Sequence, residues 1–76
     1  MSELHRITVD PERCSGKPTI RGMRIRVCDI LGMLAAGTPR AVILEDYDYL
    51  EDADITASLE YAAMVTERPV VVSAAA

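Results

Sequence analysis

Five basic side chains stand close together near the start of this sequence, and no acidic residue interrupts them. They are Arg13, Lys17, Arg21, Arg24 and Arg26. An arginine can form two parallel hydrogen bonds to a carboxylate or a phosphate, whereas a lysine acts as a point charge. The net charge of −4 hides this cluster, because the second half of the chain is strongly acidic. The spacing therefore predicts that this basic segment contacts an anionic surface. The structural alternative is that the arginines cover the core and pair with acidic residues of the chain itself.

The residues for catalysis are largely missing. His5 is the only histidine and lies near the start of the chain, where a surface position is expected. Cys14 has basic neighbours that could lower its pKa, but no general base is evident beside it. Together with Cys28 it is predicted to be a reduced thiol of a cytoplasmic protein. We therefore expect a protein that is not an enzyme and that uses no cofactor.

Acidic residues gather between positions 45 and 54, where a calcium loop is conceivable. Asp46 and Asp48 have the spacing of the first two ligands of such a loop, but Glu51 stands where glycine is needed and Ala57 where the last ligand is needed. A solvated turn fits the pattern better, with Asp52 and Asp54 favouring the start of a following helix. No metal site is predicted.

The first part of the chain has the pattern of an extended arm, residues 5–27. Short strands are predicted at 6–9 and 19–20, separated by Asp10-Pro11 and by a turn at 15–18. Residues 24–27 alternate charged and apolar side chains, as a half-exposed extended segment does.

Three helices are predicted after the arm. The first covers 28–36 and stops at Gly37, and the second covers 39–46, with Thr38 as its cap and Pro39 as its first residue. Val42 and Ile43 of the second helix are expected to face inward. The third covers 52–66, with an inward stripe predicted from the spacing of its apolar residues: Ile55, Leu59, Ala62 and Ala63.

These elements predict one mainly α domain over residues 1–76. It has a tri-helical helix-turn-helix (winged-helix-like) core at 28–66, a short N-terminal β arm or hairpin, and an apolar C-terminal tail at 67–76. Val70, Val71 and Val72 of the tail are expected to dock on a partner. The chain is short and has no Phe or Trp, so its own core is small. A homo-oligomer, most simply a dimer, is therefore expected.

Membrane insertion and export are not indicated. No stretch approaches the roughly 18 apolar residues that a membrane span needs. Nor does an apolar region follow the first residues to act as an export signal. The sequence predicts a cytoplasmic protein.

The sequence of residues 10–27 resembles the signature of domain-of-unknown-function family 433. The most specific part is Gly16-Lys17-Pro18-x-Ile20-Arg21-Gly22-x-Arg24-Ile25, and the resemblance continues through Asp29-Ile30-Leu31, Ala35-Ala36-Gly37, 43–47, Leu50 and Tyr61-Ala62-Ala63. The resemblance covers roughly residues 5–65. Members commonly have a Thr or Ser cap where this chain has Glu51.

The resemblance implies a role in a type II toxin–antitoxin system of the VapBC kind. Family members are small helix-turn-helix proteins, many of them encoded beside a PIN-like ribonuclease toxin. The implied function is an antitoxin that binds the toxin directly. An arginine of the basic segment, with Arg21, Arg24 and Arg26 as candidates, would pair with the carboxylates of the toxin's metal-binding cleft. Strand addition by the tail is the other possible anchor.

Two further functions stay open. One is a transcriptional regulator, acting on its own operator DNA through the basic arm of a dimer. The third helix itself is a poor reader of DNA, because its acidic residues are repelled by phosphates. The other is a purely structural oligomerisation module.

Overall fold

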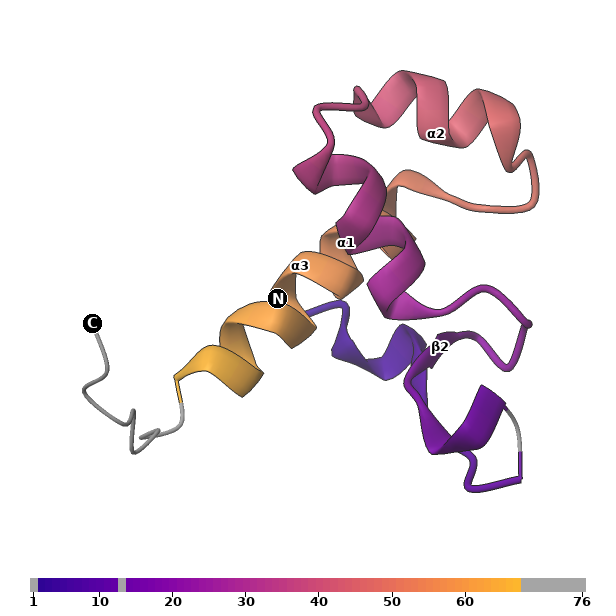
Figure 1. Cartoon of the computed structure of the whole chain (residues 1–76), viewed down its shortest axis with the longest axis vertical. Helices are drawn as coiled ribbons and strands as arrows, with labels where there is room; N and C mark the ends of the chain where they lie inside the picture. The colour runs from indigo at the N-terminus through magenta and orange to yellow at the C-terminus, as the bar shows by residue number, and fades with distance from the viewer. Residues whose placement is uncertain (1, 13, 68–76) are drawn as a thin grey trace.

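Three α-helices follow a short antiparallel hairpin in this computed structural model, which describes residues 2–12 and 14–67. In chain order the elements are η1 (Leu4–Arg6), β1 (Ile7–Thr8), η2 (Cys14–Gly16), β2 (Thr19–Ile20), α1 (Val27–Ala35), α2 (Arg40–Asp46) and α3 (Asp52–Thr66). Helix α1 lies at the centre, with α2 on one side and the hairpin on the other (Figure 1). The predicted fold class, mainly α with a short N-terminal hairpin, is confirmed.

The N-terminal arm is part of the core. Strands β1 and β2 pair in the register Ile7–Ile20 and Thr8–Thr19. The first strand is shorter than predicted, because Arg6 belongs to η1 and Val9 lies beyond the pairing. Ile25, by contrast, was predicted in a half-exposed segment and is buried.

Helix α1 begins one residue earlier than predicted, at Val27, and its last residue is Ala35. The predicted stop at Gly37 is correct. This glycine has a φ of 89°, a left-handed conformation that favours glycine. The amide of Thr38 then donates to the Met33 carbonyl at 3.0 Å, which closes the helix end.

Helix α2 departs from the prediction at its start and on its buried face. Pro39 is the extended N-cap residue and Arg40 the first helical one, so Thr38 does not cap the helix. Ile43 is fully buried, but Val42 is 40% exposed. Successive residues of a helix point about 100° apart, and α2 is covered on one side only. Its buried face therefore includes Ile43 and not Val42.

Helix α3 has the predicted bounds but a different buried face. Ile55 is buried as expected, whereas Leu59 and Ala63 are exposed. The buried residues are instead Asp54, Ile55, Ala57 and Ser58. The face is rotated because the carboxylate of Asp54 points inward, where basic side chains of the arm surround it.

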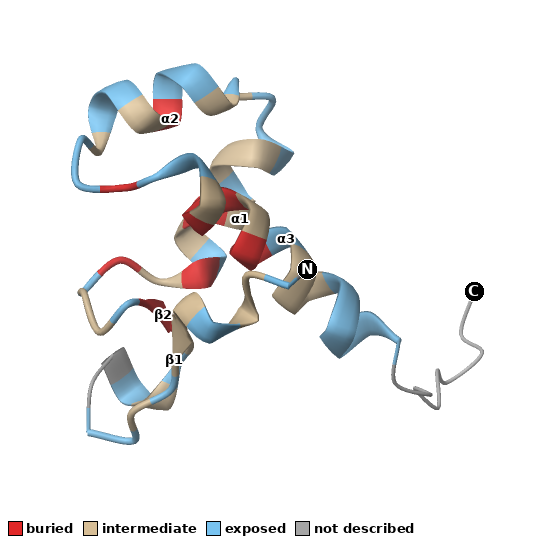
Figure 2. Ribbon diagram, turned by 180° about the vertical axis from the view of Figure 1, so that it is seen from behind, coloured by how far each residue is buried: buried red, intermediate tan, exposed pale blue. Residues whose placement is uncertain are grey.

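The hydrophobic core joins the arm to all three helices. Its buried members come from β2, the turn after it, the three helices and the connection between α2 and α3 (Figure 2): Ile20, Ile25, Val27, Ile30, Ile43, Leu50 and Ile55. They are mostly β-branched, in keeping with a chain that has no Phe or Trp. None of the helices in residues 2–12 and 14–67 is long and apolar enough to cross a membrane.

Candidate partner-binding site

Asp54 is a buried carboxylate that two arginines bind. This fully buried carboxylate lies in the first turn of α3. Arg21 binds it through two hydrogen bonds, Nε to Oδ1 at 3.1 Å and Nη2 to Oδ2 at 2.8 Å. Arg6 donates to Oδ1 at 3.0 Å, and the backbone N–H of Glu51 donates to Oδ2 at 2.8 Å. Four donors thus satisfy a carboxylate that would otherwise be costly to bury.

The same cluster fastens three separate segments together. The Arg6 guanidinium also reaches the Glu51 carboxylate at 2.6 Å, and Arg21 Nη2 donates to the Tyr49 carbonyl at 2.9 Å. The backbone N–H of Arg21 donates to the Arg6 carbonyl at 2.8 Å. Arg6, Arg21, Glu51 and Asp54, which we call the Asp54 cluster, hold the arm against the start of α3.

Burial alone would raise the pKa of Asp54. The hydrogen bonds from Arg21, from the Glu51 amide and from Arg6 outweigh burial, and the pKa of Asp54 is lowered. Hydrogen bonding by Arg26 and by Arg40 lowers the pKa of Asp29 and of Asp52, respectively. Each of these groups stabilises the fold while it is ionised.

Acid should therefore weaken the fold. An aspartate with a folded-state pKa below its unfolded value of about 3.9 stabilises fully at higher pH and loses that contribution as the pH falls through the folded value. We expect the free energy of unfolding, measured with urea, to be clearly lower at about pH 3 than at about pH 6. An Asp54→Asn variant should show a smaller difference between the two conditions. Equal stability of the parent chain at both pH values would contradict this assignment.

Arg26 binds Asp29 at the start of α1. Its backbone N–H donates to Asp29 Oδ2 at 3.0 Å, and its guanidinium binds both oxygens of the same carboxylate at 3.2 and 2.9 Å. Asp29 thereby satisfies an amide at the helix start and places a negative charge there. Asp29 and Asp54 illustrate the same arrangement, in which the third residue of a helix is an aspartate bound to an arginine.

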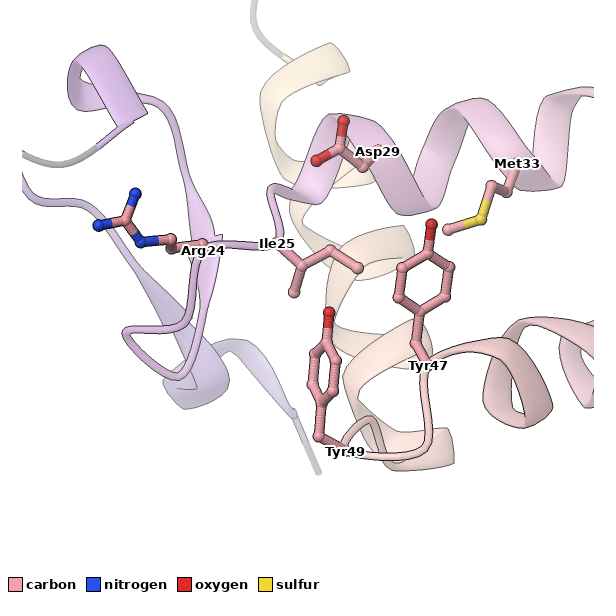
Figure 3. Close-up of a pocket in the computed structure, with 6 residues that line it drawn as sticks. All are labelled: Arg24, Ile25, Asp29, Met33, Tyr47 and Tyr49. Atoms are coloured by element: carbon pink, nitrogen blue, oxygen red, sulfur yellow. The ribbon is translucent and has the colours of Figure 1, made fainter.

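Arg24 stands at the rim of a surface pocket of about 410 Å³, which we call the front pocket. Its lining comes from the arm, from α1 and from the connection between α2 and α3: Arg24, Ile25, Asp29, Met33, Tyr47 and Tyr49. The rings of Tyr47 and Tyr49 meet edge to face, with centroids 6.1 Å apart. Figure 3 shows both rings pointing toward α1, while the guanidinium of Arg24 points away from them.

The front pocket combines apolar and charged side chains. Its tyrosine, methionine and isoleucine side chains suit an apolar or aromatic group of a partner. The exposed Arg24 suits an acidic group beside it. Tyrosine, methionine and arginine are the residue types enriched at protein interfaces. The pocket thus has the composition of a protein-binding surface.

The predicted site residues differ in their surroundings. Arg21 and Arg26 bind carboxylates of the chain itself, and Arg21, Arg24 and Lys17 are exposed. Arg13 and the tail residues Val70, Val71 and Val72 lie outside the described residues. The structural alternative thus describes Arg21 and Arg26 well, and contact of Arg24 and Lys17 with an anionic partner stays a prediction.

Sequence reasoning missed the roles of Arg6, Tyr47 and Tyr49. Arg6 is separated from its partner Asp54 by 48 residues, so no local pattern links them. The aspartate at the third position of α3 was a usable signal, since acceptors are needed there.

His5 and Cys28 are exposed. Within the described part of the chain, no group of three or more His, Cys, Asp or Glu could hold a metal ion.

Comparison with known proteins places the chain in a family. A model of the family described as "Protein of unknown function (DUF433)" matches residues 7–62. The chain belongs to the DUF433 family. The matched residues include β1, β2, α1 and α2, the whole Asp54 cluster except Arg6, and the complete lining of the front pocket.

One curated relative bears on the function of this DUF433 protein. It is a Mycobacterium tuberculosis protein named "Putative antitoxin VapB45", with 39% identity over 51 residues, which cover 62% of this chain and 21% of that protein. The chain therefore spans about a fifth of that relative's length. No solved structure matches this DUF433 protein.

Proposed function

We propose that this DUF433 protein is the antitoxin of a type II toxin–antitoxin pair and neutralises a PIN-like ribonuclease toxin by direct binding. The observation that carries the proposal is the front pocket, which an exposed arginine, two tyrosines and a methionine line together. The name of the relative supports the same class of function.

The chemistry of the toxin's cleft matches this surface. A nuclease that holds metal ions with several carboxylates has a negatively charged cleft. Arg24 would pair with one of those carboxylates in a bidentate manner, and the tyrosine rings would cover the neighbouring apolar surface. Lys17, exposed on the same arm, adds positive charge that steers the approach. Metal or RNA would then be displaced from the cleft.

The structure favours a protein partner over DNA. Arg21 and Arg26 are bound to Asp54 and Asp29, which reduces the positive charge available for phosphates. The first turn of α3 presents Asp52, whose side chain is 66% exposed. Binding to the chain's own operator would use the basic arm of two copies. Such binding is the competing outcome in the experiment below.

The decisive test is inhibition of a PIN-like nuclease, which we expect to be encoded beside the chain's own gene. We expect the purified chain to form a complex with that nuclease and to suppress its RNA cleavage. An Arg24→Ala variant should bind at least about tenfold more weakly, the effect of losing a charge-assisted hydrogen bond of at least 1.4 kcal/mol. Binding is measured by calorimetry, and cleavage with a labelled RNA.

Two further variants make the result specific. Ala41→Glu changes the net charge by the same amount as Arg24→Ala but lies on an exposed position of α2, so its affinity should stay within about twofold of the parent. Val71→Glu tests the tail as the alternative anchor.

Equal affinity of the parent and Arg24→Ala would refute the role of the front pocket. A neighbouring gene without a nuclease, or an uninhibited nuclease, would refute the function itself. A salt-dependent shift of promoter DNA by the chain alone would favour the regulator.

A further inference from the structure

A groove of about 300 Å³ lies between α1 and the C-terminal half of α3. The two helices supply most of its lining: Val27, Cys28, Leu31, Tyr61, Ala62 and Val65. Pro18 and Thr66 complete the lining, so no residue of it carries a charge, unlike the front pocket with Arg24 and Asp29. The groove therefore suits an apolar, uncharged occupant.

Two polar groups beside the groove already have partners within the chain. The hydroxyl of Thr66 donates to the Ala62 carbonyl at 2.8 Å, one turn back on α3. The carbonyl of Pro18 accepts a hydrogen bond from the Val27 N–H at 2.9 Å. An apolar side chain can cover these groups without leaving them unpaired.

The sequence that follows α3 has the chemistry of such an occupant. Thr66 is the last residue of α3 and lines the groove. Residues 68–76 lie outside the described part of the chain, and their sequence has one charged side chain, Arg68, ahead of Val70-Val71-Val72. Pro69 cannot continue the helix, so the chain can turn back before it reaches the three valines.

We propose that these three valines dock in the groove of the same molecule. Three extended residues span about 10 Å, whereas Tyr61 and Val65 are four residues apart and hence about 6 Å apart along the axis of α3. The valines are therefore long enough to run back along the α3 wall of the groove. They are also tethered beside it, which gives them an effective concentration in about the millimolar range. A separate partner with the same chemistry lacks this advantage.

Docking of the tail leaves the front pocket open. Val27, Cys28 and Leu31 of the groove lie on one face of α1. Asp29 and Met33 of the front pocket lie on average about half a turn away, at roughly 100° per residue. The docked valines are occupied within the chain, so they do not serve as an anchor for a partner. This inference does not depend on the proposed antitoxin function.

The thiol of Cys28 tests whether the tail covers the groove. In a Cys14→Ser background, the reaction of Cys28 with an uncharged disulfide reagent is compared with and without three combined tail substitutions: Val70→Ser, Val71→Ser and Val72→Ser. The substituted tail should let Cys28 react at least about fivefold faster, because a docked tail exposes the thiol only while it opens. With the parent tail, the rate should be the same from about 1 to 200 µM protein, since the cover belongs to the same molecule.

Two single variants make the result specific. Val42→Ser replaces an exposed valine of α2 and should leave the reaction rate of Cys28 unchanged. Val65→Ser trims the groove itself and should raise the rate. It should add little when it is combined with the three tail substitutions, because both changes act on one contact. Circular dichroism should show equal helix content in all variants.

Three results would overturn the proposal. The first is an equal rate with the parent tail and the substituted tail. The second is a rate that falls as the protein concentration rises, since a second copy would then cover Cys28. The third is a full addition of the effects of Val65→Ser and of the tail substitutions, since the tail would then not lie on Val65.

Discussion

Asp54→Asn should lower the free energy of unfolding by about 3 kcal/mol, the lower end of the range for breaking a buried ion pair. The asparagine keeps the size of the side chain but removes the charge that Arg6 and Arg21 share. It also turns an NH2 group toward donors that need an acceptor. A chain of 76 residues has a total stability of about 4–11 kcal/mol. Urea denaturation followed by circular dichroism should therefore show a much lower midpoint.

Asp52→Asn is the matched control, two residues away in the same turn. Asp52 also pairs with an arginine, since Arg40 Nε donates to its Oδ1 at 2.9 Å, but its side chain is 66% exposed. A surface ion pair contributes less than about 1 kcal/mol, so this variant should stay close to the parent. If the two variants lost equal stability, burial of Asp54 would not be the source of its effect.

The Asp54 cluster also bears on partner recognition. Arg21 adopts a left-handed conformation with a φ of 46°, at the start of the turn that carries Arg24. A non-glycine residue is held there only by its surroundings, and the two bonds to Asp54 and the one to the Tyr49 carbonyl supply them. Tyr49 in turn lines the front pocket. We infer that the cluster positions both walls of the proposed site.

The helices could be predicted from the sequence because their end signals are local. Gly37 ends α1, and the start of α3 follows from its acidic first turn. The arm was predicted with nearly the right strands for the same reason. The family was also predicted correctly, from the motif between Gly16 and Ile25.

The partners of the basic residues could not be predicted from local signals. The run from Arg13 to Arg26 looks uniform in sequence, but its members have different neighbours in space. Arg21 meets Asp54, 33 residues away, whereas Arg26 meets Asp29, three residues away. Only the second pairing is visible locally. The contact of Arg24 with a partner stays a prediction.

Local sequence patterns also could not show which face of α2 is buried. Both Val42 and Ile43 were expected to face inward. Ile43→Ala should lower the free energy of unfolding by about 3 kcal/mol, because it removes buried methyl groups and leaves a cavity in the core. Ile43 lies among the side chains that join the helices to the arm, with little freedom to fill that cavity. The loss should appear in thermal and urea unfolding alike.

Val42→Ala tests whether Val42 is exposed, as in the structure, or buried, as the sequence pattern predicts. Val42 keeps 40% of its surface in water, so truncation removes little buried area, and the better helix propensity of alanine offsets part of the loss. Its effect should stay within about 0.5 kcal/mol, as for most surface substitutions. Equal losses at the two neighbouring positions would mean that α2 buries both residues. The helix would then be rotated relative to the core, and Tyr47 at its end would no longer stand where it lines the front pocket.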